Sequence, residues 1–259
     1  MLENGARAAA GVDVGTECVK AVVAGADGRI LGRAVAPTRG YFQACSYEVL
    51  TAALEDAQLQ PSDLSGIGAT GFAMNCVRDA TTTATEESCH ALGAFHHAPH
   101  AMTLVDIGGR DPHVMHVGDD GRRVDARGVR RCAVGIGSFL MFAARHLDIA
   151  PAGLQELAAA ASMPAPVSSY CSVFSGSEVL ERLREGASRE AVALGCMHSV
   201  AERIVEIGGF THPIVVCGGV VEFFPGVLRA LEELSGVEAR AVPDAIYTGA
   251  LGAALKVLQ

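Results

Sequence analysis

Three short glycine-containing turns have the residue types needed to bind a phosphate group. Asp13-Val14-Gly15-Thr16, Asp106-Ile107-Gly108-Gly109 and Cys217-Gly218-Gly219-Val220 each follow a run rich in β-branched residues. A glycine at such a turn lets backbone N–H groups approach an anion without a Cβ in the way. The Thr16 hydroxyl adds a donor, and the Asp13 carboxylate can hold Mg²⁺ through water. One such turn is typical of an ordinary hairpin, but the three together favour a nucleotide site in which two acidic turns hold a triphosphate.

Two cysteines, Cys132 and Cys171, each precede a short glycine-containing turn and then a helical pattern. Ser175 and Glu178 have the spacing of a capping box, which predicts that a helix begins soon after Cys171. A helix N-terminus favours the thiolate, and its free N–H groups can donate to cluster sulfides. From the residues alone, buried core thiols are the more common alternative for both cysteines.

The elements that must position these residues follow from hydrophobic periodicity. Strands are predicted in the first half of the chain and helices mainly in the second, and a strand that ends in Val-Asp-x-Gly occurs twice, which favours duplicated lobes. The predicted strands are 11–15, 19–25, 29–36, 67–72, 102–109, 112–118, 121–129 and 213–220; the predicted helices are 51–59, 138–147, 153–162, 177–186, 190–207 and 225–236.

Composition narrows the class of protein. Of the 259 residues, 50% are hydrophobic and 19% are charged, as in a compact globular protein. The net charge of −9 argues against a nucleic-acid partner, and the apolar runs are too short for a membrane span. No signal peptide is predicted, so we expect a cytoplasmic protein whose eight cysteines form no disulfides. The chain has no Cys-x-x-Cys pair, and the cluster His96, His97 and His100 is not expected to bind metal.

The order of the three turns resembles the phosphate-1, phosphate-2 and adenosine motifs of the actin, sugar-kinase and Hsp70 ATPase superfamily. With Cys132 and Cys171, it resembles more narrowly the BadF/BadG/BcrA/BcrD ATPase family, which contains activators of 2-hydroxyacyl-CoA dehydratases and ATPase subunits of benzoyl-CoA reductase. The resemblance implies an α/β, two-lobed actin-like (ribonuclease H-like) fold with duplicated lobes. We expect lobe I over residues 1–98, with helix 247–259 packing back on it, and lobe II over residues 99–246.

The resemblance also implies the roles of individual residues. Cys132 and Cys171 would ligate a [4Fe–4S] cluster shared with two cysteines of a second, homologous chain. ATP and Mg²⁺ would be the other cofactors, with Asp13, Asp106 and Arg110 as catalytic residues. The residues expected to bind the nucleotide are Gly15, Thr16, Lys20, Gly108, Gly109, Gly135, Gly137, Gly218, Gly219 and Val220.

Two positions depart from the pattern of the family's free activators. Arg110 stands where the activators carry a glutamine, and Met141 stands where they tend to carry an acidic residue. These departures favour an electron-transfer subunit of a benzoyl-CoA reductase-like complex, which couples ATP hydrolysis to one-electron transfer from ferredoxin to a substrate-reducing acyl-CoA module.

Three alternatives stay open. The first is a homodimeric activator of a 2-hydroxyacyl-CoA dehydratase, which shares the mechanism but not the partners. The second is a small-molecule kinase on the same fold, for which this short chain shows no inserted substrate domain. The third is a nucleotide-dependent regulator without turnover.

Overall fold

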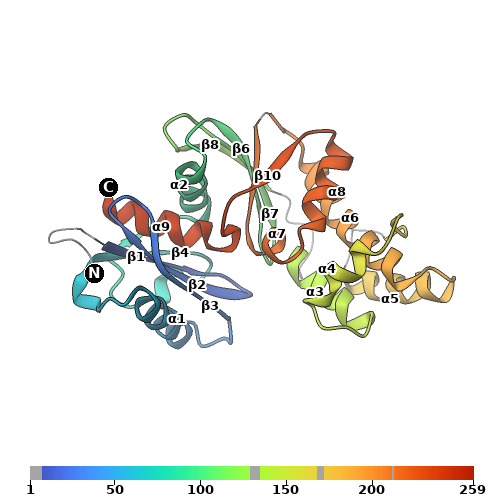
Figure 1. The fold of residues 1–259 in the computed structure, drawn as a ribbon, viewed down its shortest axis with the longest axis horizontal. Helices are drawn as coiled ribbons and strands as arrows, with labels where there is room; N and C mark the ends of the chain where they lie inside the picture. Colours follow the sequence, from blue (N-terminus) through green and yellow to red (C-terminus); the bar gives the residue numbers. More distant parts are fainter. Residues whose placement is uncertain (1–7, 129–134, 168–171, 212) are drawn as a thin grey trace. The chain divides into compact units, whose positions relative to one another are not determined.

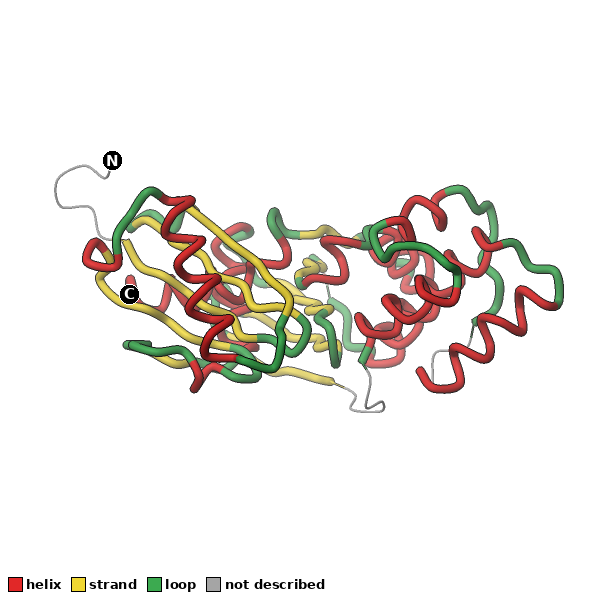
Figure 2. Tube along the Cα trace, turned by 90° about the horizontal axis from the view of Figure 1, so that it is seen from below, coloured by secondary structure: helices red, strands yellow, loops and turns green. Residues whose placement is uncertain are grey.

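The computed structural model describes residues 8–128, 135–167, 172–211 and 213–259 (Figure 1). The chain divides into two compact units, each of which combines strands with helices (Figure 2). One unit comprises Met1–Ala101, Val117–Val124 and Val242–Gln259, and the other comprises Met102–His116 and Asp125–Ala241.

The first unit is built on a five-stranded sheet with the order β3-β2-β1-β4-β5. Strand β1 pairs with β2 in antiparallel fashion and with β4 in parallel, and β2 also pairs with β3. The strands are β1 (Ala8–Val14), β2 (Cys18–Gly25), β3 (Ile30–Pro37), β4 (Leu64–Thr70) and β5 (Thr82–Thr83).

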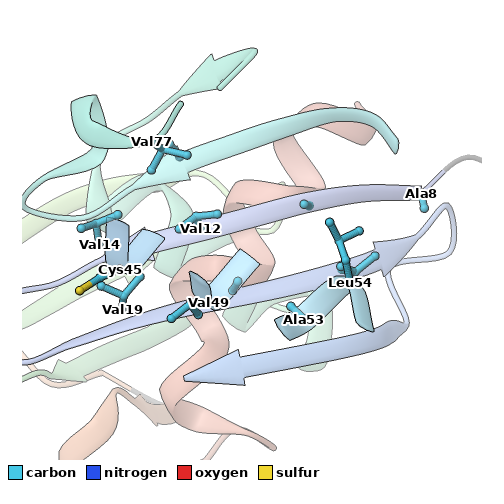
Figure 3. Packing of buried hydrophobic residues seen from close by; sticks show 13 residues of the cluster. Ala8, Val12, Val14, Val19, Cys45, Val49, Ala53, Leu54 and Val77 are labelled. Atoms are coloured by element: carbon cyan, nitrogen blue, oxygen red, sulfur yellow. The ribbon is translucent and has the colours of Figure 1, made fainter. Parts of the chain in front are cut away.

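Helices cover both faces of this sheet, and β1 is therefore buried along its whole length. Alternate β1 residues, from Ala8 to Val14, pack against Cys45, Val49 and Ala53 of helix α1 (Figure 3). On the other face, Val22 and Ala24 of β2 pack against the last helix of the chain. The helices of this unit are α1 (Phe42–Ala57), α2 (Glu86–His97) and α9 (Thr248–Leu258), with short 3₁₀ turns η1 (Pro61–Asp63), η2 (Met74–Cys76) and η3 (Ala245–Tyr247).

The second sheet has the order β10-β9-β6-β7-β8, and β9 pairs in parallel with both β6 and β10. Its strands are β6 (Met102–Ile107), β7 (Pro112–Val117), β8 (Arg123–Gly128), β9 (Ile214–Cys217) and β10 (Ala239–Ala241). The helices of this unit are α3 (Ile136–His146), α4 (Gly153–Ala159), α5 (Ser172–Arg184), α6 (Arg189–Ile207), α7 (Gly219–Phe223) and α8 (Gly226–Ser235).

The two sheets share one strand order. In each sheet the first three strands of the unit lie side by side, and the other two strands lie beyond the first one. The order is β3-β2-β1-β4-β5 in one sheet and β8-β7-β6-β9-β10 in the other. In both, the central strand ends in an acidic turn, at Asp13 and at Asp106. The predicted α/β fold with duplicated lobes is therefore confirmed.

Three helices differ from what the sequence predicts. Helix α1 begins at Phe42 rather than at residue 51, because Cys45, Val49 and Ala53 extend its apolar face toward the N-terminus. Helix α2 has no predicted counterpart. Helix α5 begins at Ser172, soon after Cys171 as predicted, but Ser175 lies within the helix and is not its N-cap. Within the described part of the chain, none of the helices combines the length and hydropathy needed to traverse a lipid bilayer.

Candidate functional site

The first acidic turn joins β1 to β2. Asp13 is buried, and it lies directly opposite Lys20 in the antiparallel register of the two strands. The Lys20 Nζ lies 3.0 Å from Asp13 Oδ2, so the two side chains form an ion pair that is largely shielded from water. At the turn itself, the amide of Gly15 donates to the Cys18 carbonyl and the Thr38 hydroxyl donates to the Gly15 carbonyl. The predicted nucleotide residues Gly15 and Thr16 are thus half-exposed at a hairpin turn that its own hydrogen bonds hold in shape.

Three further elements enclose Asp13 within the first unit. A Cβ at Gly71, just after β4, would come 2.5 Å from Asp13 Oδ1. A Cβ at Gly249, at the start of α9, would come 3.3 Å from Asp13 Oδ2 and 2.6 Å from Nε2 of His90 on α2. No sequence pattern groups Gly71, His90 and Gly249 with Asp13, because the elements that carry them are far apart along the chain.

The second acidic turn follows β6. Asp106 is buried, and the Sγ of Cys217, at the end of the neighbouring strand β9, lies 3.8 Å from its Oδ1. Gly108 and Gly109 are half-exposed, and no atom of the described residues lies within 4 Å of a Cβ built on Gly108. An anion can therefore approach the backbone of Gly108 closely. Arg110 is exposed, and its Nε lies 3.8 Å from the Asp111 carboxylate.

The third glycine turn contacts the second one. Gly218 has a φ of 102°, and a Cβ there would come 2.8 Å from Asp106 Oδ1 and 2.5 Å from the Ile107 carbonyl oxygen. The predicted strand over 213–220 is too long, since β9 ends at Cys217 and the short helix α7 begins at Gly219. Gly219 and Val220 are thus helical, and Gly218 is the position at which the chain must turn close to Asp106.

The start of helix α3 is hydrogen-bonded to the second acidic turn. The amides of Gly137 and Ser138 donate to the Gly109 carbonyl at 3.1 and 3.4 Å, and the amide of Ile136 donates to the Arg110 carbonyl at 2.9 Å. Gly135 and Gly137 pack against the backbone of the same turn. A helix N-terminus with free N–H groups is therefore not found at the start of α3, where these three groups donate to the turn. The nucleotide-binding role of Gly135 and Gly137 stays a prediction.

Cys132 and Cys171, the predicted cluster ligands, lie outside the described residues. The remaining six cysteines are free thiols. Burial raises the pKa of Cys89 to about 11 and that of Cys196 to about 12, and it also raises the pKa of Cys18, against the opposing charge of Lys20. In the described ranges, no three His, Cys, Asp or Glu side chains come together as a metal site, and this includes the surroundings of His96, His97 and His100.

The sequence analysis singled out neither helix α2 nor the position of His90 near Asp13, and only the helix has a signal in the sequence. Helix α2 begins with Thr85 as its N-cap, whose side chain accepts from the Ser88 amide, and two glutamates occupy the first turn. These are recognisable start signals for the helix that carries His90. The position of His90 beside Asp13 has no comparable signal.

The chain resembles known proteins over nearly its whole length. The model of the BadF/BadG/BcrA/BcrD ATPase family matches residues 10–257. The (R)-2-hydroxyglutaryl-CoA dehydratase activating ATPase of Acidaminococcus fermentans is 34% identical, and the activator of lactoyl-CoA dehydratase of Anaerotignum propionicum is 36% identical, each over 95% of both chains. One of the subunits of the benzoyl-CoA reductase of Thauera aromatica is 29% identical over 95% of this chain and 91% of its own.

Two solved structures have the same fold. Component A of the Acidaminococcus fermentans (R)-2-hydroxyglutaryl-CoA dehydratase superposes with a TM-score of 0.90 and 33% identity, covering 97% of this chain and 98% of its own. The activator of the 2-hydroxyisocaproyl-CoA dehydratase from Clostridium difficile, with bound ADPNP, gives a TM-score of 0.89 and 30% identity, covering 97% and 94%. The fold is that of the actin-like ATPases, as predicted.

Proposed function

Because the chain belongs to the BadF/BadG/BcrA/BcrD ATPase family, we propose that it is the ATP-hydrolysing activator of a 2-hydroxyacyl-CoA dehydratase and works as a pair of identical chains. Two dehydratase activators are 34% and 36% identical to it, whereas the benzoyl-CoA reductase chain is 29% identical. The sequence-based preference for an integral reductase subunit therefore takes second place.

The observation that carries the proposal is the hydrogen bonding between the second acidic turn and helix α3. Carbonyl groups of Gly109 and Arg110 accept from the first amides of α3, and Cys132 precedes that helix in the chain. A phosphate that binds at Gly108 and Gly109, or leaves, changes the conformation that this turn prefers. Because the turn and the helix share hydrogen bonds, the start of α3 must move with it. Nucleotide binding at this turn would thereby be coupled to α3, the helix that follows Cys132 in the sequence.

ATP with Mg²⁺ is the ligand that the acidic turns fit. Mg²⁺ prefers carboxylate and water oxygens, and the buried carboxylates of Asp13 and Asp106 offer them. Lys20 supplies an ammonium group for a phosphate, and the space beside Gly108 admits one to the backbone. The exposed guanidinium of Arg110 would stabilise the charge that develops on the γ-phosphate. A related activator was solved with bound ADPNP, which supports an adenine nucleotide.

Cys132 and Cys171 would hold a [4Fe–4S] cluster together with the same two cysteines of a second chain, because such a cluster needs four thiolates. The cluster would supply one-electron transfer from a ferredoxin-type donor to the dehydratase. This chain would position the cluster through helices α3 and α5, which follow the two cysteines in the sequence. The two helices pack against each other, so a displacement of α3 would be transmitted to α5.

The cluster role is tested by anaerobic purification of the wild-type chain and of a Cys132→Ser, Cys171→Ser double variant. We expect about four irons per pair of wild-type chains, an EPR signal on reduction, and loss of both in the variant. A Cys45→Ser, Cys76→Ser double variant is the matched control, because these thiols lie in the first unit. Near-normal iron in the cluster-ligand variant would exclude the proposed ligands.

The same preparation distinguishes the rival functions. A homodimer that stimulates a separately purified dehydratase in an ATP-dependent manner supports the activator. A stable complex with non-identical subunits supports the reductase subunit, the function favoured by Arg110 and by Met141, which is exposed on α3. Phosphate transferred to a small substrate, without bound iron, supports a kinase.

A further inference from the structure

One basic side chain is paired with Asp13, and a second basic side chain lies nearby. The Lys20 ammonium lies 3.0 Å from Asp13 Oδ2. A Cβ built on Gly249 would lie 2.6 Å from His90 Nε2 and 3.3 Å from Asp13 Oδ2, so these two atoms lie near the same point beside Gly249. All four residues belong to the first unit, and they come from β1, β2, α2 and α9.

Close packing of helices α2 and α9 fixes the position of His90. A Cβ at Gly252 of α9 would overlap the Cys89 carbonyl of α2, and a Cβ at Gly93 of α2 would overlap the Thr248 carbonyl of α9. The two backbones therefore approach each other with no side chain between them. His90 is only 9% exposed, so its ring has little freedom to turn away from Asp13 into water.

The side chains of Lys20 and His90 differ in how far they can move. Lysine is a flexible point charge on a four-carbon stem, so Lys20 can leave Asp13 for a phosphate that binds at the turn. A buried imidazole held between two helices cannot follow. A carboxylate that loses one partner inside a protein needs another donor to keep its orientation.

We propose that His90 is a positioning residue for Asp13: its Nε2–H donates to Asp13 Oδ2 when Lys20 turns to the phosphate, and Gly249 leaves the room for this contact. The inference rests on the proposed function, because it assumes that Asp13 serves a Mg²⁺–nucleotide complex. Asp13 keeps one orientation throughout, and Lys20 is the group that moves.

The test measures equilibrium binding of Mn²⁺–ADPNP, with free Mn²⁺ followed by EPR, so that no turnover is needed. We expect His90→Leu to weaken binding about tenfold or more, which is the loss for a hydrogen bond to a charged group. His90→Gln keeps an N–H donor and should stay within about threefold of the wild type. His97→Leu, the same change two turns later on α2, should bind as the wild type does.

A double-variant cycle separates positioning of Asp13 from general damage to the fold. In an Asp13→Asn background, His90→Leu should cause no further loss, because the partner carboxylate is already gone. An equal loss in both backgrounds, or a His90→Leu variant that binds normally, overturns the inference while the proposed function stands. A wild-type chain that binds no Mn²⁺–ADPNP overturns both.

Discussion

The amide of Gly137, in the first turn of α3, donates a 3.1 Å hydrogen bond to the carbonyl of Gly109 in the second acidic turn. One residue belongs to the predicted phosphate site and the other to the helix that follows Cys132. A hydrogen bond between two backbones cannot be lengthened much without being lost. The turn and the helix therefore move together. Three substitutions test this connection and the surroundings of the two aspartates, and a fourth prediction concerns a buried thiol.

Gly137→Ala should separate nucleotide binding from activation. Its Cβ would come 2.8 Å from the Gly109 Cα, so α3 must shift away from the turn. We expect at least about tenfold less stimulation of the dehydratase, a smaller loss of ATP affinity, and a loss of about 1–3 kcal/mol in stability. Calorimetry measures the ATP affinity, and a coupled assay measures the stimulation of the dehydratase.

The control is Gly153→Ala, at the start of α4, where the nearest atom to an added Cβ is 4.0 Å away. Full stimulation by Gly137→Ala would contradict the connection.

Gly218→Ala should abolish nucleotide binding through steric conflict with the second acidic turn. The φ of 102° is strained for alanine, and the Cβ would press on the Ile107 carbonyl and on Asp106. Gly186→Ala is a matched control, because Gly186 has a similar φ of 97° with nothing within 4 Å of an added Cβ. We expect a cost of about 1–2 kcal/mol for the control, from backbone strain alone, and a larger cost for Gly218→Ala. Urea unfolding measures both, and equal losses would mean that the contact with Asp106 is unimportant.

Lys20→Met should lower both affinity and stability, because it leaves the buried Asp13 carboxylate without its ion-pair partner. We expect the Kd for ATP to rise at least about tenfold and the free energy of unfolding to fall by about 2 kcal/mol or more. Lys256→Met, in the last turn of α9, removes the chain's other lysine and should do neither. The stability lost in Lys20→Met should return in part when Asp13→Asn is added, since no buried charge then lacks a partner. A stable Lys20→Met variant with normal affinity would rule out this role for the ion pair.

Alkaline pH should destabilise the fold through Cys89. Burial raises the pKa of its thiol from 9.0 to about 11, so between these values the unfolded chain releases a proton that the folded chain keeps. The folded state is therefore favoured fully below pH 9, and this contribution is lost as pH rises toward 11. Two pKa units correspond to at most about 2.7 kcal/mol. Urea unfolding at pH 8, 9 and 10 should show a smaller decline for Cys89→Ala than for wild type, while parallel declines would contradict the assignment.

The sequence by itself determined where the chain turns after three of its strands. Asp13, Asp106 and Cys217 each end or nearly end a strand, because β-branched runs followed by glycine specify that local geometry. The repeated Val-Asp-x-Gly pattern also indicated the duplicated fold. These features depend on residues that are neighbours in the sequence, so a sequence pattern can predict them.

Only the tertiary structure decided which groups surround the two aspartates. Lys20 faces Asp13 because the register of β1 with β2 sets them opposite each other, and a shift of one residue would send Lys20 to the other face. His90 and Gly249 come near Asp13 because α2 and α9 pack closely, and Gly137 meets Gly109 because α3 begins at the second turn. Such contacts join elements that are far apart in the chain. They depend on side-chain volume and helix packing, which no periodic sequence pattern predicts.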